Sequence, residues 1–286
     1  MAKTQDLKRR IRSIKNTQQL TRAMKMVSAA KLRRAQERVL AARPYAQRTL
    51  SVLQSLARRA NPELNPLLRA NEGDRVDAVI MSSDRGLCGA FNASVFRLAE
   101  AHLSEHEAGA ELTIATVGKK SREYYRRRDY NIVRDWADIF RQVEFSTARE
   151  IADLAMERYI GGDASRVYLI HNSFKSAIAA DPVAMQLLPI LPASFDDADS
   201  TEDYLYEPSA QVLFDALLPH YVQQAVYQAM LESVAAEHAA RMTAMDSATS
   251  NAGELIEALT LTMNRARQAS ITTEIIEVVS GAAALG

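Results

Sequence analysis

The chain has 286 residues, a formal net charge of zero and a single cysteine, Cys88. Apolar residues make up 48 % and charged residues 24 %, which excludes global disorder, and one cysteine excludes an internal disulfide. No apolar run reaches the roughly 18 residues that a membrane-spanning helix needs. The charge is uneven, because residues 1–59 hold 16 basic and 2 acidic side chains, whereas residues 208–286 hold 3 basic and 8 acidic ones. Such asymmetry indicates segments that meet different partners.

Residues 3–57 are predicted to form one long helix. They contain no glycine and many good helix formers, and apolar residues such as Leu7, Ile11 and Ile14 recur at steps of three and four. Pro44 is expected to kink or break this helix, because a proline removes one backbone hydrogen bond at a cost of about 3 kcal/mol. The basic pattern continues well past the length of a targeting peptide, so we expect neither a secretory signal nor a transit peptide.

The middle of the chain alternates strand and helix patterns. Strands are predicted at 76–81, 112–117, 131–133, 166–173 and 182–190, and helices at 90–107, 119–128 and 147–159. This alternation is typical of a mainly parallel sheet covered by helices, with the last strand antiparallel because its connection is short. An acidic segment, "FDDADSTEDY" at residues 195–204, is expected to be a loop.

Residues 209–285 are predicted to form a second long helix, with Pro219 near its start and Gly253 the only glycine before Gly281. Its apolar and small residues follow the alternating steps of three and four that characterise a coiled-coil seam. They are Met245, Ala248, Ala252, Leu255, Leu259, Thr262, Ala266 and Ala269.

The two terminal helices must both bury an apolar stripe, and the simplest arrangement buries each stripe on the other. The expected fold class is therefore α/β plus a long coiled coil: an antiparallel coiled coil of the N- and C-terminal helices with an inserted Rossmann-like α/β domain. The expected boundaries are 1–59 for the first helix, 60–207 for the α/β domain and 208–286 for the second helix. Because the second helix is longer, its apolar end lacks an internal partner and is expected to lie inside another protein.

The turn "SSDRGLCGAFN" (residues 82–92) follows a strand and precedes a helix, as phosphate-binding turns do. Gly86 and Gly89 supply only G-x-x-G, which is neither a dinucleotide fingerprint nor a P-loop, and Asp84 would repel a phosphate. The favoured interpretation is a packing turn, although a nucleotide-binding regulatory protein remains the alternative. The histidines and the cysteine supply no complete set of metal ligands at the usual spacing and no nucleophile motif occurs, so we expect no catalytic, cofactor or metal site.

Several segments resemble the gamma subunit of the F-type ATP synthase, bacterial type. They are "IKNTQQLTRAMKMVSAAKLRRAQ" (14–36), the glycine turn, "DYLYEP" (203–208), "EHAARMTAMDSATSNA" (237–252) and "NRARQASITTEIIEVVSGAAAL" (264–285). The resemblance covers essentially the whole chain in order. It implies a central rotor shaft that transmits torque from a membrane c-ring to a catalytic hexamer of alpha and beta subunits, with no nucleotide chemistry on this chain. It also implies an epsilon partner, no cofactor and a peripheral position on the cytoplasmic face of the cell membrane.

The same resemblance implies roles for individual residues. Contacts with the alpha/beta head would involve Met24, Lys25, Arg241, Arg267, Gln268, Thr272 and Ile276. A foot contact with the c-ring and epsilon would involve Tyr204, Tyr206 and Glu207. For Met24, ordinary packing in the seam stays open, and for the two tyrosines so does the anchoring of a loop.

The resemblance also bears on regulation. Chloroplast members carry an inserted cysteine pair as a redox switch, and this chain has neither insertion nor pair.

A basic scaffold for nucleic acid is a third interpretation of the first helix. It is disfavoured, because residues 1–44 lack aromatic side chains for base stacking and the rest of the chain is acidic.

Overall fold

The computed structural model describes the whole chain except residues 1, 62–63, 107–110, 178, 192–205 and 286. Two long helices, α1 (Ala2–Ala57) and α5 (Ala210–Leu285), flank the α/β elements in the sequence. The chain divides into two compact units: a first unit of residues 1–28 and 241–286, and a second unit of residues 29–240. Each long helix contributes to both units.

The second unit contains one five-stranded sheet in the order β3-β2-β1-β4-β5. Its strands are β1 (Arg75–Met81), β2 (Glu111–Val117), β3 (Asn131–Trp136), β4 (Arg166–Phe174) and β5 (Ala180–Leu188). β1 pairs in parallel with β2 and β4, β2 pairs in parallel with β3, and β5 runs antiparallel to β4. The predicted mainly parallel sheet with an antiparallel last strand is confirmed.

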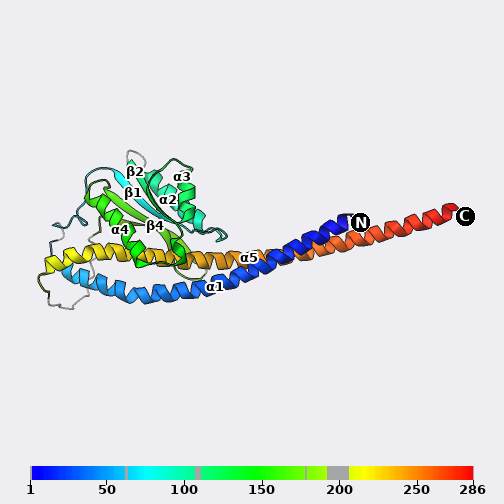
Figure 1. The fold of residues 1–286 in the computed structure, drawn as a ribbon, viewed down its shortest axis with the longest axis horizontal. Helices are drawn as coiled ribbons and strands as arrows, with labels where there is room; N and C mark the ends of the chain where they lie inside the picture. Colours follow the sequence, from blue (N-terminus) through cyan, green and yellow to red (C-terminus); the bar gives the residue numbers. More distant parts are fainter. Residues whose placement is uncertain (1, 62–63, 107–110, 178, 192–205, 286) are drawn as a thin grey trace. The chain divides into compact units, whose positions relative to one another are not determined.

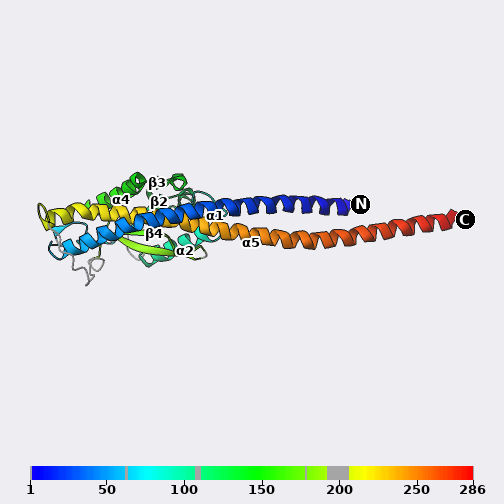
Figure 2. The ribbon, with the colours of Figure 1, turned by 90° about the horizontal axis from the view of Figure 1, so that it is seen from below.

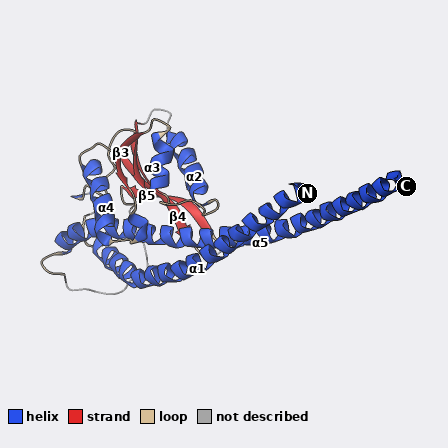
Figure 3. Cartoon of the chain, turned by 45° about the vertical axis from the view of Figure 1, so that its right-hand side comes forward, coloured by secondary structure: helices blue, strands red, loops and turns tan. Residues whose placement is uncertain are grey.

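Three helices cover the two faces of this sheet (Figure 3). They are α2 (Phe91–His106), α3 (Lys119–Arg126) and α4 (Phe145–Ile160). Successive side chains of a strand point to opposite faces. Accordingly Ala78 and Ile80 pack with α2 and α3, whereas Asp77 and Val79 face α4.

The structure differs locally from the sequence prediction. Pro44 does not end α1, which continues through it. β3 extends to Trp136 rather than ending at residue 133, because its second half pairs with β2 after a register shift. A short 3-10 helix, η2 (Ile139–Arg141), follows it, and its N-cap Asp138 has a φ of 62°.

In both units a segment of α1 runs antiparallel to a segment of α5. In the first unit, Gln18 and Thr21 bond Thr249 while Lys25 bonds Asp246, so position numbers rise on one helix as they fall on the other. In the second unit, residues 31–38 line the same hollow as residues 231–238, whereas Ser55 bonds Tyr206. The antiparallel pairing of the terminal helices is therefore confirmed.

Candidate functional site

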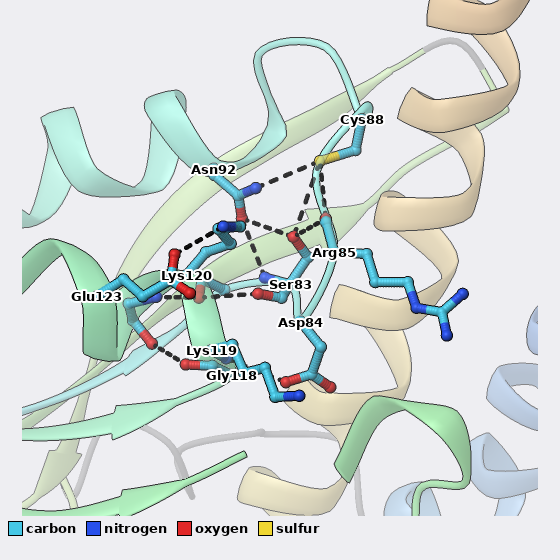
Figure 4. A network of polar contacts seen from close by, with 11 residues as sticks. Ser83, Asp84, Arg85, Cys88, Asn92, Gly118, Lys119, Lys120 and Glu123 are labelled. Carbon is cyan, nitrogen blue, oxygen red and sulfur yellow. Dashed lines mark hydrogen bonds and ion pairs between the residues drawn. The ribbon is translucent and has the colours of Figure 1, made fainter. Parts of the chain in front are cut away.

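The glycine turn is held by a compact hydrogen-bond network between β1 and α2 (Figure 4). The Asn92 side-chain oxygen accepts bonds from the backbone N–H of Ser83 and from its hydroxyl, both at 3.0 Å. The Asn92 amide donates to the Cys88 sulfur at 3.3 Å. The side chains of Ser83, Cys88 and Asn92 are therefore bonded to one another within the turn.

Asp84 closes the space in front of the turn. Its carboxylate accepts backbone N–H bonds from Lys119 at 3.0 Å, from Asp138 at 2.9 Å and from Phe140 at 3.3 Å. It thereby ties the loops that follow β2 and β3 to the end of β1. An anion approaching this edge of the sheet would meet a carboxylate instead of free N–H donors, which opposes phosphate binding.

In sheets of this order, ligands bind outside the carboxyl ends of the strands, where the strand order reverses. That point lies here between β1 and β4. It is filled by the chain's own α5, because Ala236 forms a buried cluster with Cys88 and Phe91 of the glycine turn, against which Phe174 at the end of β4 also packs. The glycine turn thus packs a helix in the place where related sheets hold a cofactor.

The first unit has a polar layer at its helix pair. The hydroxyls of Thr21 and Thr249 lie 2.8 Å apart, and the Gln18 amide donates to the Thr249 carbonyl at 3.3 Å. One turn further along α1, the Lys25 ammonium lies 2.6 Å from the Asp246 carboxylate, with both side chains about half exposed. Arg241, another basic residue expected at the head contact, lies five positions before Asp246 on α5.

Sequence reasoning missed Thr21, Thr249 and Asp246. Once the antiparallel pairing was assumed, the lone acidic residue at 246 beside a basic helix could have indicated a partner for Lys25. Met24 is half-buried, in accordance with the seam-packing alternative, and its proposed contact with a head is untested.

The end of α5 carries the other candidate contact residues. Arg267, Gln268 and Thr272 are exposed, and the Thr272 hydroxyl donates to the Gln268 carbonyl at 2.9 Å. Ile276 is 59 % exposed. Four neighbouring apolar residues are also exposed: Ile271, Ile275, Val278 and Val279. Figures 1 and 2 both show α5 continuing past the N-terminal end of α1, so this segment has no helix beside it within the unit.

Two of the three foot residues, Tyr206 and Glu207, lie shortly before the start of α5. The Tyr206 hydroxyl lies 2.7 Å from the Ser55 hydroxyl and accepts a bond from Arg59 at 3.2 Å, and the Arg59 guanidinium also lies 5.4 Å from the tyrosine ring centre. These contacts anchor the start of α5 on the end of α1. Glu207 is exposed, and Tyr204 lies outside the described residues.

A basic hollow of about 170 Å³ lies in the second unit, between the two long helices and the segment after β3. Its floor is apolar, from Ala35, Phe140, Val143, Leu231 and Val234, and its rim carries the cations Lys31, Arg34, Arg38 and Arg141 with His238. None of the four cations forms an ion pair with another described residue. Like charges gathered in this way favour an anionic partner.

One buried histidine lies at the contact between β4 and α5. Burial lowers the pKa of His171 to about 4, although the nearby Glu232 carboxylate, 4.0 Å away, opposes the shift. His171 is therefore neutral at pH 7. It serves the packing of α5 on the sheet and shows no arrangement for acid–base chemistry.

The fold and these sites define a class of protein: a pair of long antiparallel helices with an inserted α/β domain whose ligand crevice is occupied by its own chain. The family model described as ATP synthase matches residues 3–285. Proteins named ATP synthase gamma chain from Pelotomaculum thermopropionicum and Chlorobaculum parvum are 48 % and 46 % identical, each over 100 % of this chain and over 100 % and 99 % of their own lengths. The chain belongs to the ATP synthase gamma chain family.

Solved structures agree with this fold. A chain of the central stalk and c-ring of Tetrahymena thermophila mitochondrial ATP synthase has a TM-score of 0.59 and 26 % identity, with 80 % of this chain and 99 % of that chain covered. A chain of Euglena gracilis mitochondrial ATP synthase has a TM-score of 0.69 over 99 % of this chain and 95 % of that chain, at 20 % identity. The chain is a non-catalytic subunit of an ATP synthase and acts as its rotor shaft. No helix among the described residues is both long enough and apolar enough to cross a membrane.

Proposed function

We propose that this chain transmits torque between a membrane c-ring and a catalytic head of alternating alpha and beta subunits, at the cytoplasmic face of the cell membrane. The observation that carries this proposal is the exposed apolar end of α5. Residues 271–280 are all exposed, and five of them are isoleucine or valine. A helix of this composition in water is an unsatisfied binding surface.

The end of α5 is proposed to turn inside the head. Arg267, Gln268, Thr272 and Ile276 would contact its loops, with the apolar positions supplying a surface that has few directional bonds. A surface of this kind can slide past successive subunits, because no single hydrogen bond must break at each step. Arg267 has no ion-pair partner among the described residues and would remain available to a carboxylate of the head.

A collar of Met24, Lys25 and Arg241 is proposed to meet acidic loops of the beta subunits. The charge of the first helix supports this assignment, since residues 1–59 hold 16 basic and 2 acidic side chains, and acidic loops would neutralise this surplus. Complementary charge of this kind raises the rate and specificity of association more than its strength.

The foot is proposed to rest on the c-ring beside the epsilon subunit, with Tyr204, Tyr206 and Glu207 at the contact. The anchoring of Tyr206 on Ser55 and Arg59 would hold this segment in a fixed orientation, while the exposed Glu207 faces a partner. In functional terms, we propose that residues 1–59 and 208–286 form the shaft and residues 60–207 the foot domain. Nucleic acid is not proposed as a partner.

The test is reconstitution. The chain is co-expressed with alpha, beta, epsilon and the membrane sector, and ATP-driven ion pumping into vesicles is measured beside ATP hydrolysis. Deletion of residues 271–286 should lower pumping or assembly, while the isolated full chain should hydrolyse no ATP. Pumping unchanged by the deletion, or turnover by the chain alone, would contradict the proposal.

A further inference from the structure

The α/β domain and α5 make two sets of contacts within the second unit. The first set joins α5 to α4: the Gln223 amide donates to Asp153 at 2.8 Å, and the ring of Tyr227 meets Phe145 edge-on with centroids 5.5 Å apart. Gln223 is 7 % exposed, so its bond to Asp153 is shielded from water. This set fixes one side of the helix.

The second set joins α5 to the carboxyl ends of the strands. The Ser173 hydroxyl donates to Glu232 at 2.8 Å, and the neighbouring His171 imidazole lies 4.0 Å from the same carboxylate. One turn later, Ala236 packs into the cluster of Cys88 and Phe91 at the glycine turn. Small side chains at 236 and 240 allow the helix to enter the crevice closely.

The two sets lie on different sides of α5. Nine positions separate Gln223 from Glu232, which at 3.6 residues per turn amounts to two and a half turns. If the domain were attached along one stripe of α5, it could roll about the helix when the domain is turned. A domain that contacts the helix on opposite sides cannot roll in this way. Holding of this kind is what the delivery of torque requires.

We propose that Gln223, Tyr227, Glu232 and Ala236 form a rigid joint through which the α/β domain turns α5, and that the glycine turn is part of this joint. The inference rests on the proposed torque function and adds the place where torque enters the shaft. Glu232 is a positioning residue in this account, because it acts through the attachment of α5 and touches no substrate.

The single native cysteine allows a direct test. Ala236→Cys places a second thiol in the cluster that contains Cys88, and oxidation with copper phenanthroline removes two electrons and two protons to join the two sulfurs. In the reconstituted complex this bond should form, should be reversed by dithiothreitol, and should leave ATP hydrolysis and pumping unchanged within twofold. The controls are the parent chain with Cys88 alone and an Ala216→Cys chain, in which the new thiol lies on an exposed position of α5.

A second variant tests the joint through its hydrogen bond. Glu232→Ala should lower the number of ions pumped per ATP severalfold while hydrolysis stays within twofold, and Glu232→Gln, which keeps an acceptor for Ser173, should restore coupling. In a chain with both Glu232→Ala and Ala236→Cys, oxidation should also restore coupling, and reduction should abolish it again.

Three outcomes would overturn the rigid joint: failure of the disulfide to form, loss of pumping on its formation, or full coupling in Glu232→Ala. Each of these outcomes concerns a variant and can occur while the complex with the parent chain couples hydrolysis to pumping. Failure of the torque function itself would instead appear as a lack of coupling in the complex with the parent chain.

Discussion

Gly118 illustrates how a single position serves the end of the sheet. Its φ is +99°, and a Cβ there would lie 2.2 Å from the Ser82 carbonyl oxygen. Its N–H donates to the Trp136 carbonyl at 2.7 Å, and the Ser82 hydroxyl accepts from Ser121 at 2.6 Å. Only glycine meets these conditions, because any side chain would separate β1 from the start of α3.

We therefore expect Gly118→Ala to lower the free energy of unfolding by about 3 kcal/mol or more, through backbone strain and a clash with a backbone atom. Trp136, the only tryptophan, ends the neighbouring strand and reports unfolding by its fluorescence in urea. Gly86→Ala is the matched control, since nothing lies within 4 Å of its Cβ position, and it should change stability by less than about 0.5 kcal/mol. Equal effects of the two changes would contradict the assignment.

Asp77 of β1 and Arg158 of α4 form a largely buried pair, with nitrogen–oxygen distances of 2.6 and 3.1 Å. Burial raises the pKa of Asp77, although the bond and charge of Arg158 oppose that shift. Arg158→Met should destabilise the chain by about 3 kcal/mol at pH 7, because it leaves a buried carboxylate without its partner.

The sign of the pH dependence follows from this environment. Without Arg158 the pKa of Asp77 rises further, so the variant should recover stability relative to the parent as the pH falls from 7 toward the ordinary aspartate value. Unfolding in urea at several pH values measures the difference. A variant whose deficit does not shrink at low pH would show that the carboxylate is solvated.

At His171 we expect the pH dependence of stability to have the opposite sign. Its pKa is lowered by burial to about 4 from 6.5, so the stability of the neutral form is present above pH 6.5 and is lost as the pH falls through 4. The full shift corresponds to about 3 kcal/mol. His171→Gln should lose less stability than the parent between pH 6.5 and 4 in the same urea measurements, and identical slopes would argue against a buried neutral imidazole.

At the scale of elements, the seam between α1 and α5 in the first unit is polar where the sequence pattern predicts small and apolar residues. Thr21 is 9 % exposed and bonds Thr249, while Met245 and Ala252 are buried on either side of Thr249 along α5. A polar layer of this kind fixes the register of paired helices, since a shift by one turn would break the contact between its two hydroxyls.

Thr21→Val and Thr249→Val should each lower stability by about 1 kcal/mol, because each removes the contact between the two hydroxyls and leaves the remaining one bonded only to a carbonyl of its own helix. The double variant should cost less than the sum of the two, which a double-mutant cycle measures as a coupling energy. Thr262→Val is the control on α5, since the Thr262 hydroxyl bonds only the Ala258 carbonyl of its own helix. Additive losses at 21 and 249 would mean that the two hydroxyls act independently.

At the scale of the whole molecule, the ligand crevice of the α/β domain is filled by α5. We expect no saturable heat on titration of the purified chain with ATP, ADP or NAD, because Asp84 and the cluster around Ala236 occupy the place where these ligands would bind. Calorimetry provides the measurement. Saturable binding that is lost on Gly89→Val would instead favour the nucleotide-binding alternative.

The sequence determined most of the fold class. Helical periodicity over residues 3–57 and 209–285 predicted both long helices, and alternating patterns between them predicted the order of strands and helices. The greater length of the second helix predicted that its apolar end has no partner within the chain. These features are local or periodic, and side-chain spacing along the chain encodes them directly.

Only the tertiary structure decided which residues meet across distant segments. The pairing of Lys25 with Asp246, the three N–H bonds to Asp84 and the entry of Ala236 beside Cys88 each join residues more than 30 positions apart. Composition and spacing do not specify such contacts, because they depend on the register between helices and on which helix reaches the sheet. The same reason explains why the glycine turn resembles a phosphate site in sequence while its place in the fold holds a helix.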